Sequence, residues 1–300
     1  MPEEIARADK DKMLSPEQKL MQAIAAPLPS TEIGVSATAN FLGREADPLQ
    51  VVFEARIEGT GVDYHEKEAQ PHFDPHMASV VMDSHGKLVD TFSDNARGNL
   101  QQPGAMELVK QNGYRFTKFL SLKPGLYQIR IGVRDGDTDR LGTAAAWVEV
   151  PDLLRHKLTM SSIFLSDLSP NQAGAAPNPA GSANETRAKE PVRSRFKQGI
   201  RFFKANAFLG YNARLYNLDA TSRQGDELLM HLEIVESGRP IVQVPWQPIS
   251  SRTISKEGMG TDIGGLMPLD IRPGVYEFHI EVKNPGSKEL ASQSVVFGVE

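Results

Sequence analysis

The chain has 300 residues, a net charge of −5 at pH 7 and a pI near 5.9. Three hundred residues exceed what one small hydrophobic core organises, so the length favours two domains. Nucleic-acid binding depends on Lys and Arg neutralising phosphates, and the acidic balance argues against it. The absence of cysteine excludes disulfides, thiolate zinc ligands and cysteine nucleophiles.

The chain carries no signal for a membrane or for export. No apolar run approaches the roughly 18 residues that a membrane-spanning helix needs. The opening segment, MPEEIARADKDKM, is charged throughout and lacks the apolar core of a signal peptide. The sequence therefore leaves two possibilities: a cytosolic protein, or an export signal on sequence that is not present here.

Residues 15–25, SPEQKLMQAIA, predict a short helix inside an N-terminal extension at residues 1–29. Its start is indicated by an N-cap hydroxyl, a proline suited to the first helical position and an early acidic side chain, namely Ser15, Pro16 and Glu17. The predicted buried face of the helix comprises Leu20, Met21 and Ile24.

From about residue 30 the sequence has the pattern of β-strands. Short segments rich in Val, Ile, Phe and Tyr are separated by Gly, Asp, Asn or Pro. Residues 83–86, DSHG, predict a hairpin turn, and residues 128–134 alternate as a half-buried strand of an antiparallel sheet does. We therefore predict an all-β fold of two tandem immunoglobulin- or fibronectin-III-like antiparallel β-sandwiches with a short N-terminal helix.

Residues 166–195 interrupt this pattern. Apolar side chains larger than Ala almost vanish there, and Pro, Ala, Asn, Ser and Gly dominate. Such a segment cannot bury enough surface to offset the entropy of ordering it. We predict a flexible linker at 166–195 between β-sandwich module 1 at residues 30–165 and β-sandwich module 2 at residues 196–300.

The two predicted modules share an internal repeat. LKPGLYQIRIGVRD, from Leu122, aligns with IRPGVYEFHIEVKN, from Ile271, at an offset of 149 positions (Pro124 to Pro273). The alignment continues without a gap to Val150 opposite Val299. Farther upstream, VVFEARIEG and MHLEIVESG form a weaker match. A shared offset over so long a stretch indicates a duplicated fold.

The shared motif Pro-Gly-x-Tyr has a structural interpretation. Pro and Gly make a turn into a strand, and the Tyr can bury its ring while its hydroxyl bonds nearby backbone, as in the tyrosine corner of Greek-key sandwiches. The residues interpreted as structural in this way are Pro124, Gly125, Tyr127, Pro273, Gly274 and Tyr276.

The sequence offers two weak metal-site candidates. The first is His72, Asp74 and His76, because imidazole and carboxylate can bind zinc or iron, although a solvated loop or strand edge is favoured. The second is Asp135, Asp137 and Asp139, which resemble the start of a calcium loop. An EF-hand needs Gly at its sixth and Glu at its twelfth position, where Arg140 and Ala146 stand, so a hairpin turn is favoured.

The other conspicuous residues have structural interpretations. Residues 258–265, GMGTDIGG, match no phosphate-binding spacing and predict a mobile loop. Trp147 is predicted to face a sandwich interior, whereas Trp246, between Pro245 and Pro248, could be exposed. No GxSxG motif or paired Ser, His and acid is present. We therefore expect neither an enzyme nor a cofactor.

Three segments resemble a known family: AIAAPLPSTEIGVSATANFL, residues 114–153 and YNARLYN. They are similar to the C-terminal half of bacterial von Willebrand factor type A-related proteins, which are predicted exported proteins common in Acidobacteria. The resemblance implies an upstream type A domain in the full-length protein, and a periplasmic, cell-envelope or secreted location. The Asp-x-Ser-x-Ser metal motif of that domain is absent here, so no metal-site residue is carried over.

Three functions remain open. The leading expectation is a non-enzymatic interaction or scaffolding segment of an envelope or secreted type A-related protein, with a protein or cell-surface partner. The alternative is a carbohydrate-binding or accessory module of an envelope enzyme, which an exposed aromatic strip on one sheet would favour. The third is a metal-dependent hydrolase, which would add Asp63 and His65 to the first metal candidate.

Overall fold

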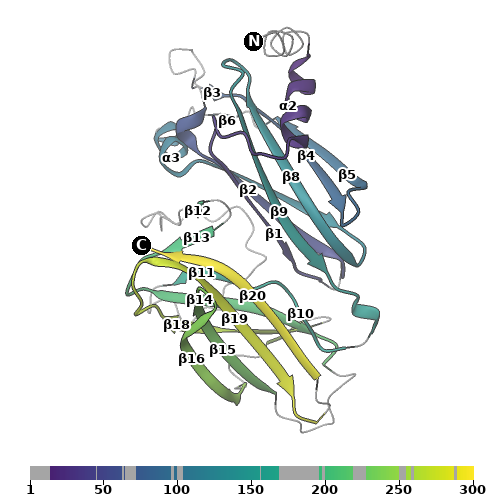
Figure 1. The fold of residues 1–300 in the computed structure, drawn as a ribbon, viewed down its shortest axis with the longest axis vertical. Coiled ribbons are helices and arrows are strands. Elements are labelled where there is room, and N and C mark those ends of the chain that lie inside the picture. The colour runs from purple at the N-terminus through teal and green to yellow at the C-terminus, as the bar shows by residue number, and fades with distance from the viewer. Residues whose placement is uncertain are drawn as a thin grey trace. The chain divides into compact units, whose positions relative to one another are not determined.

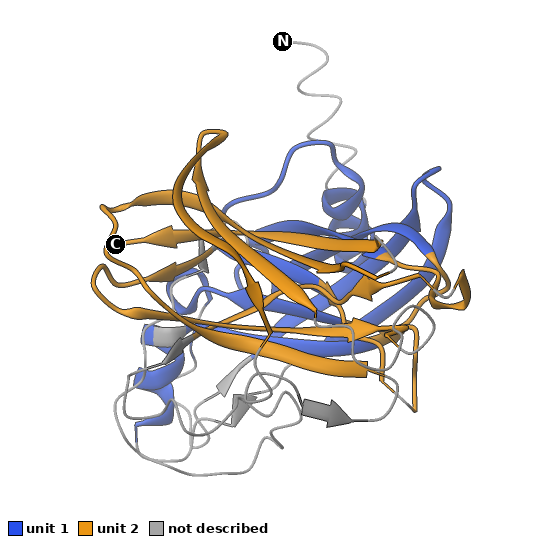
Figure 2. Cartoon of the chain, turned by 90° about the horizontal axis from the view of Figure 1, so that it is seen from below, with its two compact units in different colours: residues 1–39, 52–119, 125–149 blue, residues 40–51, 120–124, 150–300 orange. Residues whose placement is uncertain are grey.

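The computed structural model contains two compact units, each built on a β-sandwich (Figures 1 and 2). Its strands pair almost entirely in antiparallel fashion, which confirms the all-β, immunoglobulin- or fibronectin-III-like prediction. Unit 1 comprises residues 1–39, 52–119 and 125–149, and unit 2 comprises residues 40–51, 120–124 and 150–300. The structure describes residues 14–44, 46–62, 64, 72–95, 98–99, 104–155, 157–168, 196–197, 200–218, 228–249, 255–257, 260–286 and 289–300.

Unit 1 is built on a four-stranded and a three-stranded sheet. The four-stranded sheet has the order β5-β4-β8-β9, formed by β5 (Leu88–Asn95), β4 (Pro75–Asp83), β8 (Gly125–Asp135) and β9 (Leu141–Val150). The three-stranded sheet has the order β1-β2-β7, formed by β1 (Val35–Phe41), β2 (Gln50–Ile57) and β7 (Tyr114–Ser121). One end of this second sheet belongs to unit 2. Strict alternation of buried and half-buried residues along β2 fits a strand with one face on the core.

The hairpin predicted at residues 83–86 is confirmed. The Gly86 N–H donates to the Asp83 carbonyl at 2.9 Å, and Gly86 has φ 77°, a conformation that glycine adopts without strain. Beside these sheets, β3 (His72–Phe73) pairs with β6 (Gly98–Asn99) in a short ribbon.

Helix α2 (Pro16–Ala25) confirms the predicted N-terminal helix. Ser15 and Gln18 form a capping box, which satisfies N–H groups of the first turn. Leu20 and Ile24 are buried against Val80, but Met21 is 43% exposed, so its predicted place on the buried face was wrong. A second helix, α3 (Ala105–Asn112), was not predicted, because Gly104 at its start supplies no capping side chain. Among the described residues, no helix is long and apolar enough to cross a membrane.

Helix α2 lies on the outer face of the four-stranded sheet of unit 1. Gly132 makes room for it, since a Cβ at this position would lie 2.6 Å from Ile24 Cγ1. Arg130 Nη1 donates to the carbonyls of Ile24 at 3.1 Å and Ala26 at 3.3 Å, where the helix carries negative partial charge. Gly132 and Arg134 are therefore buried, although the sequence predicted a polar, solvated face for this strand.

Unit 2 repeats the arrangement with more strands. In its first sheet, β14 (Phe208–Tyr216) pairs with β10 (Thr159–Met160) and β11 (Phe164–Leu168) on one side and β18 (Gly260–Pro268) on the other, followed by β17 (Ser255–Glu257). The second sheet has the order β12-β13-β20-β19-β15-β16. Its strands are β12 (Phe196–Lys197), β13 (Ile200–Phe203), β20 (Glu289–Val299), β19 (Gly274–Asn284), β15 (Leu229–Glu236) and β16 (Arg239–Pro248).

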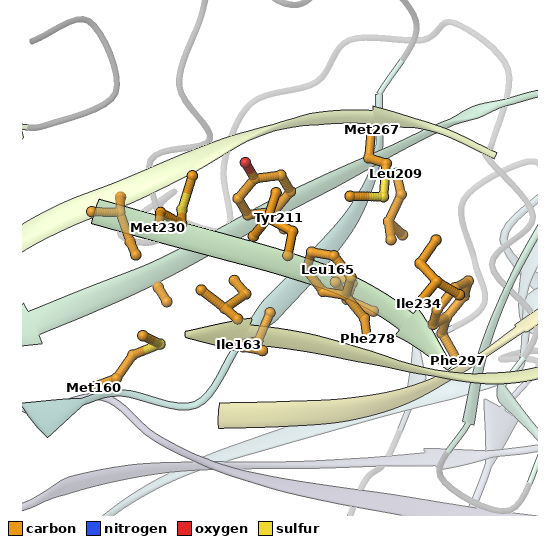
Figure 3. Close-up of a cluster of buried hydrophobic side chains, with 14 of the residues drawn as sticks. Met160, Ile163, Leu165, Leu209, Tyr211, Met230, Ile234, Met267, Phe278 and Phe297 are labelled. Atoms are coloured by element: carbon orange, nitrogen blue, oxygen red, sulfur yellow. The ribbon is translucent and has the colours of Figure 1, made fainter. Parts of the chain in front are cut away.

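The core of unit 2 lies between these two sheets (Figure 3). Met160 and Leu165, from the strands before the predicted linker, are buried with Leu209, Ile234 and Phe278. The predicted end of module 1 at residue 165 is therefore corrected: β10 and β11 belong to the core of unit 2.

The predicted linker begins and ends within unit 2. Residues 166–168 belong to β11, and residues 169–195 lie outside the described residues. On either side of them, β11 and β13 both belong to sheets of unit 2. The segment therefore does not join the two units.

The strong part of the repeat aligns equivalent strands, β8 with β19 and β9 with β20. The weaker upstream match was wrong, because it aligned β2 with β15. Strand β15 pairs with β19, as β4 pairs with β8, whereas β2 lies in the opposite sheet. Both segments alternate with the same period of two, so sequence alone did not separate a strand of one sheet from a strand of the other.

The predicted mobile loop at residues 258–265 is also corrected. From Gly260 onward the segment is strand β18, paired along its whole length with β14, and residues 258–259 lie outside the described ranges. A Cβ at Gly265 would lie 2.6 Å from the hydroxyl of Tyr211, so the glycine makes room for a core tyrosine.

Candidate binding face

The residues of the Pro-Gly-x-Tyr motif lie at the start of equivalent strands. Tyr276 is 2% exposed, and its hydroxyl donates to the carbonyl of Arg272 at 2.6 Å, four residues upstream. This is the geometry that the tyrosine-corner interpretation requires. Tyr127 is also buried, and burial raises the pKa of its hydroxyl. Pro124 and Gly125, like Pro273 and Gly274, lead into these strands.

The first metal candidate is only partly described. The carboxylate of Asp74 lies 3.8 Å from Nε2 of His76. The backbone of His72 pairs with Asn99 in the short ribbon, while its side chain, and all of Asp63 and His65, lie outside the described residues. Within the described ranges, no group of three His, Asp or Glu side chains is arranged to bind a metal ion.

The second candidate is a hairpin turn whose carboxylates have other partners. Asp135 accepts N–H bonds from Asp137 at 3.0 Å and Thr138 at 3.4 Å, as in an Asx-turn. Asp139 binds Lys19 at 3.0 Å and Arg134 at 2.5 Å. The hydrogen bond from Lys19, followed by that from Arg134, lowers the pKa of Asp139. The turn thus ties the start of helix α2 to the end of β8.

Trp147 was predicted to face the interior and instead is 56% exposed. Ala146, Val148 and Val150 are the buried residues of this part of β9. Because side chains alternate along a strand, Trp147 must face outward. The prediction placed Trp147 in the wrong phase of the alternation.

A cluster of polar and aromatic side chains lies on the outer face of β15, β16 and β19 in unit 2. We name it the histidine–tryptophan cluster, and its members are His231, Glu233, Gln243, Trp246 and Lys283. Trp246 is 37% exposed and stacks on His231, with ring centroids 5.3 Å and planes 27° apart. The ammonium of Lys283 lies 3.8 Å from the Trp246 ring centroid, a cation–π contact.

Both ring nitrogens of His231 have hydrogen-bond partners. Its Nδ1 lies 2.6 Å from the carbonyl of Val244, and its Nε2 lies 3.0 Å from a carboxylate oxygen of Glu233. The hydrogen bond from His231, followed by that from Gln243 at 2.6 Å, lowers the pKa of Glu233. The cluster thus contains a histidine–carboxylate pair beside a tryptophan.

A β-bulge positions Trp246. The pairing of β15 with β16 shifts between Met230–Gln247 and Leu232–Val244, so two residues of β16 lie opposite His231 alone. A bulge bends its strand and redirects a side chain, and the edge strand tolerates Pro245 because its missing N–H is not needed there. The sequence signal that was missed is therefore the Pro-Trp pair in an edge strand.

A second imidazole–carboxylate pair continues the face along β19. His279 Nε2 lies 3.3 Å from a carboxylate oxygen of Glu277, and His279 is the cross-strand neighbour of Glu233. A hydrogen bond with Ser294 is the main cause that lowers the pKa of Glu277.

The two units use the same outer face differently. At the repeat offset of 149, His279 corresponds to Arg130 and Glu281 to Gly132, the two residues on which helix α2 is held in unit 1. In the part of unit 2 that the structure describes, no helix lies on this face. The histidine–tryptophan cluster therefore occupies a face that unit 1 covers internally.

No protein-family model matches the chain, and no curated protein matches it. Among solved structures, the chain is similar to a Bacteroides uniformis β-glucuronidase 2, at 12% identity and a TM-score of 0.21, and the match covers 39% of this chain and 13% of that chain. The Clostridium thermocellum CbhA fibronectin(III)-like modules follow (9% identity, 83% and 84%, TM-score 0.19). Escherichia coli α2-macroglobulin matches at 8% identity (89% and 23%, TM-score 0.27). The chain thus spans 13% and 23% of the length of two of these proteins, and at such TM-scores no function follows.

Proposed function

We propose that the chain is a non-enzymatic binding segment and that the histidine–tryptophan cluster is its contact surface. The observation that carries the proposal is Trp246, partly exposed on the outer sheet face and in contact with both His231 and Lys283. Rigid aromatic side chains surrounded by polar groups are typical centres of binding energy in protein interfaces. The preformed hydrogen bonds of Glu233 reduce the entropy lost when a partner binds.

A protein partner fits this face better than a polysaccharide. An exposed aromatic strip on one sheet would favour a polysaccharide, and the exposed Phe and Trp side chains of the described residues are instead dispersed. Phe119 lies on β7, Trp147 on β9 and Trp246 on β16, and these strands belong to three different sheets. The resemblance to von Willebrand type A-related proteins supports, as a proposal, a periplasmic, cell-envelope or secreted setting with a type A domain upstream.

The experiment is site-specific photocrosslinking in source cells. A benzophenone amino acid replaces Ile241, a 43% exposed residue of β16. We expect one major adduct, and we expect it to disappear when Trp246→Ala is added. The same crosslinker at Leu88, 56% exposed on β5, is the matched control and should not give this adduct. Absence of an adduct, or one that is insensitive to Trp246→Ala, would contradict the proposal.

The alternative is tested by electrophoresis of the chain through gels containing soluble polysaccharides. We expect the same mobility with and without polysaccharide. Retardation that is lost in Trp246→Ala would instead assign the face to glycans.

A further inference from the structure

Among the described residues, one edge of the four-stranded sheet of unit 1 is open over most of its length. Strand β9 is the last strand of the order β5-β4-β8-β9. Its beginning has partners on the outer side: Ile33 N–H donates to the Leu141 carbonyl at 3.1 Å, and Thr143 N–H donates to the Ser30 carbonyl at 2.9 Å. Beyond Thr143, none of the strands in the described ranges pairs with this side of β9. We name residues 145–149 the β9 edge.

The equivalent edge of unit 2 is occupied by a parallel strand. Strand β13 pairs with the end of β20, with Phe202 opposite Gly298 and Phe203 opposite Val299. The repeat offset of 149 makes Gly298 the counterpart of Glu149. The ladder continues past β20, because Glu300 N–H donates to the Phe203 carbonyl at 2.8 Å. Unit 2 therefore shows which kind of element this edge accepts.

The side chains of β13 show how the added strand is anchored. Phe203 points inward, is 1% exposed and packs edge-on against Phe297, with ring centroids 6.1 Å apart. Phe202 points outward, and its ring covers Gly298, whose missing side chain leaves room for it. In unit 1 the counterpart of that glycine is the exposed Glu149. In a strand added to β9, the residue at the position of Phe202 would lie across from Glu149. A basic side chain suits that position better than the Phe of β13.

The β9 edge also lacks proline and lysine, two of the features that protect sheet edges. Natural sheets protect their edges with proline, lysine or bulges. Strand β16, an edge of unit 2, carries Pro240, Pro245 and Pro248 and a bulge. The β9 edge has neither proline nor lysine, and Trp147, 56% exposed, lies within it.

We propose that the β9 edge binds an extended peptide segment of a partner protein as an added parallel strand. The peptide carries a Lys or Arg across from Glu149 and apolar residues on both sides of it, which face the core. Its main chain bonds the edge, and its side chains cover Trp147. This site is separate from the histidine–tryptophan cluster and does not depend on it. Pro151 stands at the counterpart of Glu300, so the added ladder ends before it.

The test uses the full chain with Trp246→Phe, so that Trp147 is the only tryptophan. The probe is a synthetic peptide of residues 198–205 in which Arg201→Val and Phe202→Lys adapt the β13 sequence to this edge. We expect a saturable blue shift of Trp147 emission and slower hydrogen exchange of the amides within residues 145–149. No shift, or protection elsewhere, would overturn the proposal.

Two variants make the test specific. Glu300 N–H faces β13, and N–H groups two residues apart along a strand face the same side, so Gly298 N–H faces β13 as well. Glu149 is the counterpart of Gly298, and its N–H therefore faces the open side. Glu149→Pro removes this donor and should abolish binding. Glu149→Lys keeps the backbone intact and should weaken the Lys peptide about tenfold, while a peptide with Glu at that position gains affinity. Equal binding of both peptides by Glu149→Lys would contradict the charge assignment.

A second copy of the chain is the competing occupant. Sedimentation velocity of the unmodified chain over a range of concentrations should show no dimer that depends on this edge. A dimer that Glu149→Pro abolishes would assign the edge to self-association and overturn the peptide proposal.

Discussion

Arg214 and Asp262 form an ion pair across the first sheet of unit 2. Two hydrogen bonds, of 2.6 and 2.8 Å, join the guanidinium to the carboxylate, and the side chains are 9% and 16% exposed. Removal of Asp262 takes this carboxylate away from a buried guanidinium, which is costly. We expect Asp262→Ala to lower the free energy of unfolding by about 3–5 kcal/mol. Urea denaturation followed by Trp246 fluorescence, in a Trp147→Phe background, reports on unit 2. The double variant Arg214→Met, Asp262→Leu should cost less than Asp262→Ala alone, and an equal or larger cost would contradict this account.

The hydroxyl of Tyr276 contributes to the same unit through one hydrogen bond. Tyr276→Phe keeps the buried ring but leaves the carbonyl of Arg272 without this donor. We expect the free energy of unfolding to fall by about 1 kcal/mol. The matched control is Ser292→Ala, which removes an exposed hydroxyl from β20 and should leave stability within about 0.5 kcal/mol of the parent. Equal effects of the two variants would argue against the tyrosine corner.

The pKa of Glu233 predicts how unit 2 responds to acid. Hydrogen bonds from His231 and then Gln243 hold this pKa below the ordinary value of 4.5. The ionised carboxylate therefore stabilises the folded unit above the unfolded pKa, and this contribution is lost as the pH falls through the folded pKa. We expect Glu233→Gln to flatten the loss of stability between about pH 5 and pH 3. In a His231→Ala background the same substitution should have a smaller effect, because the main cause of the shift is gone.

At the scale of single elements, helix α2 depends on a missing side chain. A Cβ at position 132 would lie 2.6 Å from Ile24 and 2.8 Å from Leu20, so Gly132→Val should displace the helix while suiting the strand. We expect the amides of residues 20–25 to lose hydrogen-exchange protection while those of β4 and β8 keep it. Ala145→Val places the same valine side chain at an exposed position of β9 and is the control. Retained protection of the helix in Gly132→Val would show that the sheet face adapts.

Elements with local signals were predictable, and elements fixed by distant partners were not. Ser15 and Gln18 lie within one turn and specify the start of α2, and the motif around Tyr276 contains its own hydrogen-bond partner four residues away. Strands β10 and β11 are short, and their pairing with β14 is set by burial against a partner about 50 residues later. The histidine–tryptophan cluster requires a bulge that redirects Trp246, and no local pattern predicts the direction of a side chain at a bulge.

For the whole molecule, the boundary between the units does not coincide with the low-complexity segment. A fragment of residues 196–300 lacks β10 and β11, and with them the buried Leu158, Met160, Ile163 and Leu165. We expect this fragment to show no cooperative thermal transition by near-UV circular dichroism. A fragment of residues 151–300 keeps both strands and should be the better folded of the two. A cooperative transition of the shorter fragment, at the temperature of the longer one, would contradict this division.

The return of the chain to unit 2 on both sides of residues 169–195 gives that stretch a thermodynamic role different from that of a tether. Its length sets the entropy of bringing together two segments of unit 2, and it does not set the distance over which the two units can separate. Closure entropy grows only with the logarithm of loop length, so doubling the stretch should cost about 0.6 kcal/mol. We therefore expect insertions there to change the stability of unit 2 little.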